Sequence, residues 1–402
     1  MRLPLSDIRV LDLSRLLPGG FCTQMLADFG ADVIKVEDTG AGDYVRLAPP
    51  YHDGSQDSVR SAMFLALNRN KRSIQLDLKT EAGRDALLRL VEDADVLLES
   101  FRPGVLARLG LGYETLHERN PELIICAITG YGLTGPNVQR SGHDINYLAL
   151  AGLLGLTGES DGPPVSAAGQ IADLGGGALM AAVGILAALR ERDGSGSAPG
   201  SGRGQVVDVS MWDGALSWMC LPAAQALAEG RSQRRGEFLL GGAVICYRPY
   251  RCADAYVSIG AVEPKFWAAW CHGVGRPDLL AHQFDPPGSD AHRAVEEIFL
   301  ARTRAEWERF ASEHDCCLEP VLELDEALES DLAQAREMVV TVDQPGLAQP
   351  VRVVGPPIKL SRTPADAHRR PAPALGEHTD EVLAEAGIDF ATNTNQREGI
   401  SA

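Results

Sequence analysis

Short hydrophobic runs alternate with helical patterns through the first half of the chain. The pattern predicts strands at residues 8–13, 32–36, 95–99, 123–128 and 205–210, and helices at 21–29, 82–94 and 175–192. A chain break is expected at Pro18-Gly19-Gly20, before the first helix. Strands separated by helices are typical of βαβ units, whose strands lie parallel. The first half therefore predicts an α/β fold with a parallel sheet.

The pattern changes in the second half. The Gly- and Ser-rich residues 194–202 predict an exposed flexible loop. Two β-prone runs at 243–250 and 255–259 predict a hairpin, and helical sequence follows them, so a second and smaller α+β domain is expected at 235–325. Residues 376–380 are expected to cap a last helix at 381–386, and residues 391–402 to be disordered.

Composition limits the partners. The chain has 402 residues, of which 45% are hydrophobic, so it can bury a substantial core and form more than one domain. The 37 basic and 55 acidic residues give a net charge of −18, which argues against nucleic acid as the main partner. The charge leaves room for a small anionic ligand in a local basic pocket.

Targeting and metal-binding signals are missing from the sequence. No apolar run reaches the roughly 18 uncharged residues of a membrane span, and the longest, 174–189, stops at Arg190. The N-terminus has no signal-peptide pattern. The eight Cys residues are scattered, without metal-ligand spacing or a disulfide framework. We expect a cytoplasmic protein with reduced thiols, no metal site and no membrane association.

Two segments could carry acid/base chemistry. His143 stands beside Asp144, and an imidazole titrates near neutrality. The alternative is an ordinary helix start with a packed histidine. Asp173 precedes three glycines that open the long helix, where free N–H groups stabilise anions and a ligand can approach the backbone closely. The alternative is an Asp that only caps the helix.

Two further segments have charged side chains next to strands. Glu263 follows a β-prone run and precedes Pro264, so it is either a functional carboxylate or a solvated Glu at a helix start. Arginines flank a Pro-Gly turn after the strand at 95–99, where crevices open in α/β sheets. A phosphate clamp could be formed there by Arg102, Arg108, Arg69, Lys71 and Arg72. The alternative is a solvated loop.

Taken together, these motifs resemble a known family. The ordered set comprises LPGGFCTQMLADFGADVIKVE (17–37), NRNKRSIQLDLK (68–79), ESFRPGVLARLGLGY (99–113), ITGYGLTGP (128–136), GHDINYLALAGLLGLTG (142–158), IADLGGG (171–177), GQVVDVSM (204–211) and YRCADAYVSIGAVEPKFW (250–267). It resembles the α-methylacyl-CoA racemases of the family III CoA-transferase (CaiB/BaiF-type) superfamily, over nearly the whole chain. The substrate implied is an acyl-CoA thioester, with a place in lipid metabolism.

The resemblance distinguishes two chemistries. In the CoA-transferases, an aspartate at the position of Asp144 is the acyl-accepting nucleophile and usually follows a residue other than His. The racemases have a His before it, as here at His143, with Asp173 and Glu263 further along. The resemblance therefore implies epimerisation at C2 of 2-methylacyl-CoA thioesters. CoA transfer through Asp144 and acyl-CoA binding without catalysis are the alternatives.

Epimerisation requires two acid/base groups on opposite faces of C2. The resemblance implies that His143 and Asp173 are this pair, and that the backbone N–H of Asp173 holds the enolate oxygen. Glu263 would orient His143, and Tyr147 would support the site by hydrogen bonding. No metal and no cofactor beyond the CoA moiety would be needed.

The CoA moiety is expected along the turn formed by Arg102, Gly104 and Val105, with Arg108 near the phosphates. Many racemases have an Arg directly after the second strand, but this chain has Asp38. The adenosine end would therefore use Arg69, Lys71 or Arg72.

The resemblance also implies the domain organisation. Residues 1–225 would form most of a large CoA-binding domain with a doubly wound sheet, and residues 235–325 the small domain. Residues 340–390 would return to complete the large domain, before the tail at 391–402. Two subunits would interlock as a homodimer, with Glu263 of the partner subunit completing each site.

Overall fold

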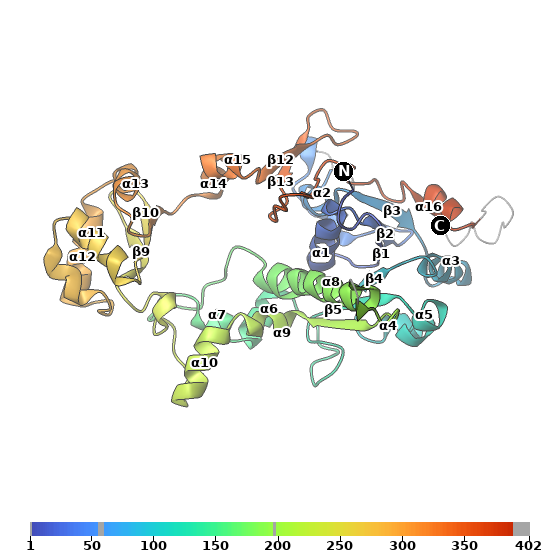
Figure 1. Cartoon of the computed structure of the whole chain (residues 1–402), viewed down its shortest axis with the longest axis horizontal. Helices are drawn as coiled ribbons and strands as arrows, with labels where there is room; N and C mark the ends of the chain where they lie inside the picture. Colours follow the sequence, from blue (N-terminus) through green and yellow to red (C-terminus); the bar gives the residue numbers. More distant parts are fainter. Residues whose placement is uncertain (1, 55–59, 196–197, 389–402) are drawn as a thin grey trace. The chain divides into compact units, whose positions relative to one another are not determined.

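The computed structural model describes residues 2–54, 60–195 and 198–388 (Figure 1). The chain divides into two compact units. The first comprises residues 1–151, 168–218 and 331–402, and the second comprises residues 152–167 and 219–330. The chain thus leaves the first unit twice and returns to it twice. The predicted tail at 391–402 lies outside the described residues.

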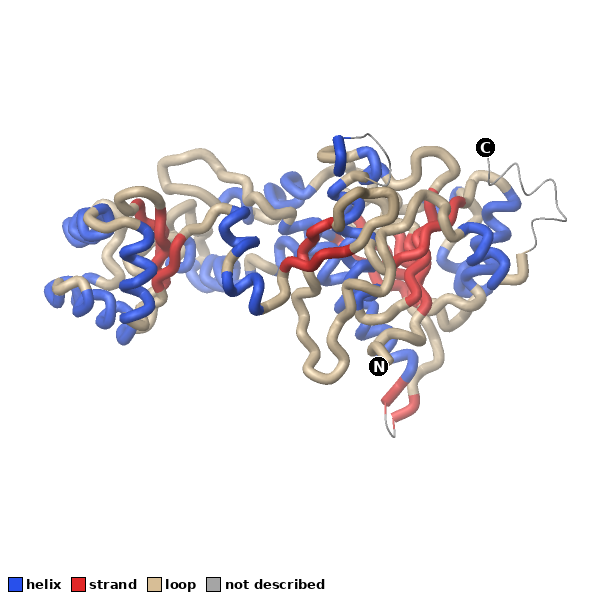
Figure 2. The backbone as a smooth tube through the Cα atoms, turned by 90° about the horizontal axis from the view of Figure 1, so that it is seen from above, coloured by secondary structure: helices blue, strands red, loops and turns tan. Residues whose placement is uncertain are grey.

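The first unit contains a six-stranded parallel sheet with the order β3-β2-β1-β4-β5-β8. Its strands are β1 (Arg9–Asp12), β2 (Asp32–Glu37), β3 (Lys71–Gln75), β4 (Val96–Glu99), β5 (Ile124–Thr129) and β8 (Val206–Ser210). Figure 2 shows them as one red layer with helices on both sides. The predicted α/β class is confirmed, since the sheet is parallel and doubly wound.

Both faces of the sheet are covered by helices and short helical segments. The helical elements of the first unit are η1 (Tyr44–Leu47), η2 (His52–Gly54), α1 (Leu17–Asp28), α2 (Ala62–Asn68), α3 (Glu81–Val91), α4 (Val105–Arg108), α5 (Tyr113–Arg119), α6 (Asp144–Leu150), the π-helix η3 (Ile171–Leu179), α8 (Met180–Asp193), α9 (Met211–Ser217), α15 (Asp331–Ala335) and α16 (Thr379–Glu385). Alternate strand residues such as Leu11, Ile34 and Leu97 pack against α3, α5 and α16. The other face contacts α8, which in turn packs on α1.

Two short hairpins complete the first unit. One pairs β12 (Val339–Val342) with β13 (Val351–Val354). The other pairs β6 (Gly194–Ser195) with β7 (Ala198–Pro199), in the segment that the sequence predicted to be a flexible loop. The loop prediction is therefore wrong at residues 194–195 and 198–199, which pair as strands, whereas residues 200–202 are in neither helix nor strand. Composition marked the exposure of this segment but gave no signal for strand pairing.

The second unit is smaller and has its own aromatic core. Its sheet has the order β11-β10-β9 and is antiparallel. Its elements are α7 (Leu153–Leu156), α10 (Cys220–Glu229), η4 (Leu239–Gly241), β9 (Tyr247–Arg251), β10 (Tyr256–Gly260), α11 (Pro264–Gly273), η5 (Pro277–His282), α12 (Asp290–Leu300), α13 (Arg304–Glu313), β11 (Leu318–Pro320) and α14 (Leu324–Glu329). Trp267, Trp270, Phe299 and Trp307 are fully buried together.

The second unit is longer than the range 235–325 predicted for the small domain, and it includes residues 152–167. One reason is Arg235, whose guanidinium donates hydrogen bonds to the carbonyl oxygens of Gly155, Glu159 and Gly162. These bonds hold the 155–162 segment to the chain at residue 235. The sequence around 152–167 gave no sign of this contact.

One helical stretch, Ile171–Asp193, is long and apolar enough to cross a membrane by length and composition, with a mean hydropathy of 1.8. Half of its most apolar window is buried inside the fold. It comprises η3 and α8, which pack against α1, α9 and the sheet. These contacts account for its apolar composition within the protein core.

Candidate active site

A crevice lies where the strand order reverses, between β1 and β4. The loops that follow β1, β4 and β5 supply Arg15 and Leu16, residues 100–103, and residues 129–131 to its wall. Its cavity measures about 290 Å³. Crevices at the carboxyl ends of strands beside such a reversal are the usual ligand sites of doubly wound sheets. The topology thus places the candidate site here.

His143 lines this cavity and is exposed to it from the start of α6. It is the N-cap residue of that helix, with extended backbone angles of φ −128° and ψ 172°. Its backbone N–H donates to Oδ1 of Asn146, at 3.0 Å. The two readings of the sequence are thus compatible, because His143 both starts a helix and presents an imidazole to the cavity.

Tyr147 fixes the chain just before His143. Its ring is 4% exposed, and its hydroxyl donates to the carbonyl oxygen of Gly142 at 2.6 Å. The ring also lies edge-on to Tyr131, with centroids 5.2 Å apart. A Cβ atom at Gly130 or Gly142 would come within 2.7 Å of the Tyr147 ring. Only glycine leaves room for this packing, so Tyr147 positions the peptide that carries His143.

Asp144 is engaged by the start of η3. Its Oδ1 atom accepts hydrogen bonds from the backbone N–H groups of Ala172 (2.7 Å) and Asp173 (3.0 Å). The residue is 8% exposed and is not among the residues lining the cavity. One expectation needs correction: the Asp173 N–H is bonded to Asp144, so it is not free to hold an enolate oxygen.

The Asp173 side chain lines the same cavity as His143. Burial, and then the nearby charge of Asp144, raise the pKa of Asp173 to about 6, while His143 acts in the opposite direction. Both causes disfavour the ionised carboxylate. Asp173 can therefore hold a proton closer to neutral pH than an ordinary aspartate, as an acid/base group requires.

The three glycines after Asp173 serve packing against α9. A Cβ at Gly175 would lie 2.6 Å from the Trp218 ring, and one at Gly177 would lie 2.9 Å from Met211. At Gly176 it would meet backbone atoms of α9 at 2.9 Å. The sequence suggested that these glycines admit a ligand to the backbone, and the structure corrects this. They bring η3 close to another helix.

The turn that follows β4 is held from beneath by Glu99. This buried carboxylate accepts the backbone N–H of Phe101 and the hydroxyl of Tyr113, both at 2.6 Å. Arg102 is exposed and lines the cavity. Gly104, at φ 86°, begins α4, which contains Val105 and the exposed Arg108. The turn thus presents Arg102 to the cavity, while Arg108 is exposed on the helix that follows.

Three other predicted phosphate ligands lie in the interior instead. Arg69 forms a two-pronged pair with Asp28 at 3.0 and 2.6 Å, and both side chains are 3% exposed. Lys71 is fully buried, with Nζ bonded to Gly20 O and Asn68 Oδ1.

Arg72 binds Asp32, Glu381 and Glu385, and its own side chain is 4% exposed. The assignment of Arg69, Lys71 and Arg72 to a phosphate clamp is therefore corrected. Arg69 and Arg72 are already paired with carboxylates, and Lys71 is bonded inside the core.

Sequence reasoning missed Arg15. This residue lines the cavity, and its guanidinium lies 2.7 Å from Asp38 Oδ2 and 2.8 Å from the Tyr44 hydroxyl. Asp38 therefore pairs with a cavity arginine rather than leaving the region purely acidic. The signal was the order of strand, polar residue and helix at 9–28, in which Arg15 occupies the loop after the first strand.

Glu263 lies in the second unit. It is the exposed N-cap residue of α11, between β10 and Pro264. The strand-to-helix junction expected from the sequence is present. Its role toward His143 stays a prediction.

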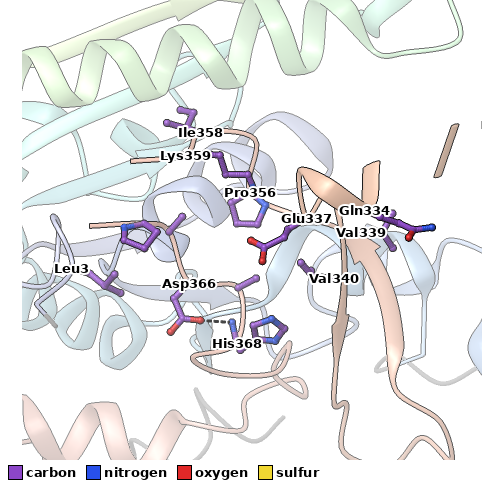
Figure 3. Close-up of a pocket in the computed structure, with 13 residues that line it drawn as sticks. Leu3, Gln334, Glu337, Val339, Val340, Pro356, Ile358, Lys359, Asp366 and His368 are labelled. Atoms are coloured by element: carbon purple, nitrogen blue, oxygen red, sulfur yellow. Dashed lines mark hydrogen bonds between the residues drawn. The ribbon is translucent and has the colours of Figure 1, made fainter. Parts of the chain in front are cut away.

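A larger cavity, of about 690 Å³, lies elsewhere in the first unit. Figure 3 shows that its wall includes Glu337, Lys359, Asp366 and His368, and Asp366 accepts the backbone N–H of His368. None of the residues predicted from the sequence lines it. Its residues come from positions 334–368 and from Leu3. We therefore assign the chemistry to the smaller cavity.

Across residues 2–54, 60–195 and 198–388, no three or more His, Cys, Asp and Glu side chains are grouped so that they could hold a metal ion.

Fold and crevice together define an α/β protein with a ligand site at the reversal point of a doubly wound sheet. The CoA-transferase family III profile matches residues 5–379. The chain belongs to this family.

Individual relatives differ in the activity that they are named for. The chain is 38% identical over 403 residues to the succinyl-CoA:mesaconate CoA-transferase of Haloarcula marismortui, covering 97% of this chain and 98% of the relative. It is also 38% identical over 392 residues to the alpha-methylacyl-CoA racemase of Mus musculus, with coverage of 96% and 93%. A CAIB/BAIF family protein from Brucella suis has a TM-score of 0.80 at 31% identity, covering 96% of this chain and 100% of that chain. Membership in the family is thus compatible with both chemistries.

Proposed function

We propose that the protein epimerises 2-methylacyl-CoA thioesters at C2. The observation that carries this proposal is that His143, Asp173 and Asp144 have different positions relative to the cavity. His143 and Asp173 line one cavity, while Asp144 is buried behind it and bonded to two backbone N–H groups. Two acid/base groups at one cavity suit proton transfer at carbon.

The reaction balances with these two groups alone. Neutral His143 takes the α-proton, and the electron pair of the C–H bond becomes part of an enolate. Protonated Asp173 then gives its proton to the opposite face of the same carbon, so the configuration inverts. The reverse reaction starts with protonated His143 and ionised Asp173, and nothing is oxidised or reduced.

CoA transfer through Asp144 is the second candidate. It is favoured by the likeness to the mesaconate CoA-transferase of Haloarcula marismortui. In that reaction the Asp144 carboxylate attacks the thioester carbonyl and CoA leaves as a thiolate. The burial of Asp144 and its absence from the residues that line the cavity oppose this role, because a nucleophilic oxygen must face the substrate.

One experiment separates the two candidates. The protein is incubated with a (2R)-2-methylacyl-CoA in deuterated water without any acceptor acid. Deuterium at C2 together with the S epimer supports epimerisation. A parallel incubation contains an added free acid. Transfer of CoA to that acid, without deuterium exchange at C2, would support CoA transfer instead. Thioester binding with neither reaction would support a binding protein.

Asp144→Asn is expected to keep epimerase activity within about tenfold of the wild type. The asparagine Oδ1 atom can still accept the two backbone N–H groups. Removing the charge also removes one cause of the raised Asp173 pKa, so the acidic limb of the pH profile should move to lower pH. Rates of deuterium exchange measured against pH test both points. Asp173→Asn is the matched variant and should lose epimerisation. Loss of exchange in Asp144→Asn as well would contradict the supporting role given to Asp144.

The pH dependence of kcat/KM is expected to be bell-shaped and identical for both epimers. Either direction requires the pair to hold one proton, on Asp173 in one direction and on His143 in the other. Because burial and Asp144 raise the pKa of Asp173 to about 6, this carboxyl can carry the proton closer to neutral pH than an ordinary aspartate. Activity falls at low pH when the pair gains a second proton, and at high pH when it loses the last one. Profiles from about pH 4 to about pH 9 that differ between the epimers would contradict the shared-proton scheme.

The CoA moiety is proposed to lie along the turn of Arg102, Gly104 and Val105, with Arg108 near its phosphates. Arg15 is added to this set because it lines the same cavity. We further propose a cytoplasmic homodimer that needs no cofactor beyond the substrate's own CoA, with Glu263 orienting His143. Mass measurement in solution and the kinetics of Glu263→Gln test this arrangement.

A further inference from the structure

Leu16 has a backbone conformation that leucine rarely adopts. Its angles are φ 64° and ψ −144°, close to a region that is essentially reserved for glycine. It is also the N-cap residue of α1, a position that usually holds a short polar side chain. Leu16 thus departs both from the usual backbone angles of leucine and from the usual residue type at a helix N-cap. Strained residues of this kind cluster at ligand sites, where the surrounding structure holds them in place.

Buried charges hold the strained segment. The backbone N–H of Leu16 donates to Asp43 Oδ1 at 2.9 Å. Lys35 Nζ lies 2.8 Å from Asp43 Oδ2 and donates to the carbonyl oxygen of Ser14 at 3.0 Å. Lys35 and Asp43 are 0% and 1% exposed. A fully buried ion pair therefore fixes the backbone on either side of Arg15.

Core packing does not explain the strain. The Leu16 side chain is 38% exposed, and it lines the same cavity as His143 and Asp173. Pro18, two residues later, lies 3.4 Å from the place of a Cβ on Gly177, in the helix that carries Asp173. The loop that holds Leu16 thus leads into a residue that packs on η3, and Leu16 shares one cavity with the acid/base pair.

We infer that Leu16 is a specificity-determining residue whose side chain contacts the acyl group of the bound thioester. The inference rests on the proposed function, because it takes an acyl-CoA as the ligand. Glycine would fit the backbone without strain, whereas leucine adds an apolar surface to the cavity beside the reacting carbon. The buried Lys35–Asp43 pair acts as a positioning device that keeps this surface in place.

The test measures binding without turnover. Isobutyryl-CoA has an α-methyl group but no stereocentre, so calorimetry reports its affinity whether or not the protein epimerises. Leu16→Ala is expected to raise the Kd of isobutyryl-CoA about tenfold and to leave that of free CoA within about twofold. Leu16→Met retains the apolar volume and should bind both ligands like the wild type.

Three other binding results would overturn the inference. Equal losses for both ligands would place Leu16 against CoA itself, and unchanged affinities would leave it without a ligand contact. If the wild-type protein bound no isobutyryl-CoA, the premise that the cavity binds an acyl-CoA would be wrong. Failure of epimerisation with intact binding would overturn the proposed reaction and leave the result on Leu16 standing.

The Leu16→Gly variant separates the effect of losing the side chain from the effect of relieving the backbone strain. It should match Leu16→Ala in binding while melting at the same temperature as the wild type or higher, because glycine accepts the backbone angles. Glu337→Gly is the matched control, since Glu337 also has a positive φ, of 49°, and lies outside the candidate site. It should leave binding unchanged. A loss of binding in Leu16→Gly but not in Leu16→Ala would show that backbone rigidity matters rather than the side chain.

Discussion

His143→Ala is expected to slow epimerisation in both directions by about 10³-fold, the scale of a lost general acid/base. Inversion requires one group on each face of C2, and this variant has only Asp173. Deuterium exchange without inversion should survive for the epimer whose α-proton faces Asp173, because that carboxylate can remove and return a proton on one face. Asp173→Asn should give the opposite pattern. The measurement is the deuterium content and configuration at C2, starting from each pure epimer.

His368→Ala is the matched control for this variant. His368 is also an exposed histidine of the first unit, but it lines the larger cavity instead. Its loss should leave epimerisation unchanged. If His368→Ala were inactive and His143→Ala active, the chemistry would belong to the larger cavity, and the two acid/base roles would be wrong.

The sheet was largely predictable from sequence. Five of its strands are short apolar runs, and a run buried on both faces is a strong signal for a parallel strand. The strand that was missed, β3, begins with Lys71 and Arg72. Basic residues suggested a solvated loop, because sequence alone does not show that Lys71 meets Asn68 and Gly20 in the interior. Burial of a charge depends on partners that are brought together only by the fold.

The site was predictable only in part, and for a similar reason. Local sequence left His143 as a possible packed histidine at a helix start and Asp173 as a possible helix cap, and only the resemblance joined them into a pair. The structure brings both to one cavity. It also adds a link that no motif contained, the hydrogen bond from the Asp173 N–H to Asp144. This contact spans 29 positions in the chain and depends on the way η3 packs beside α6.

Arg69→Met is expected to destabilise the fold by about 3–5 kcal/mol, because it leaves the Asp28 carboxylate buried without its ion-pair partner. That is a large part of the roughly 5–15 kcal/mol by which a domain is stable. Chemical denaturation measures the loss. Arg69→Met combined with Asp28→Leu should recover much of it, because apolar side chains then fill the site where the pair was.

Arg102→Met is the contrasting change at an exposed cation. Arg102 lines the active-site cavity, and the structure gives it no carboxylate partner among the described residues. We expect its loss to leave stability within about 0.5 kcal/mol of the wild type, while raising KM for the acyl-CoA about tenfold through a lost charged hydrogen bond. The two substitutions are thus expected to have opposite effects. Loss of Arg69 lowers stability, and loss of Arg102 lowers the affinity for the substrate. A stable Arg69→Met enzyme with a raised KM would return Arg69 to the phosphate site, because a cation that only holds the core has no reason to act on the substrate alone.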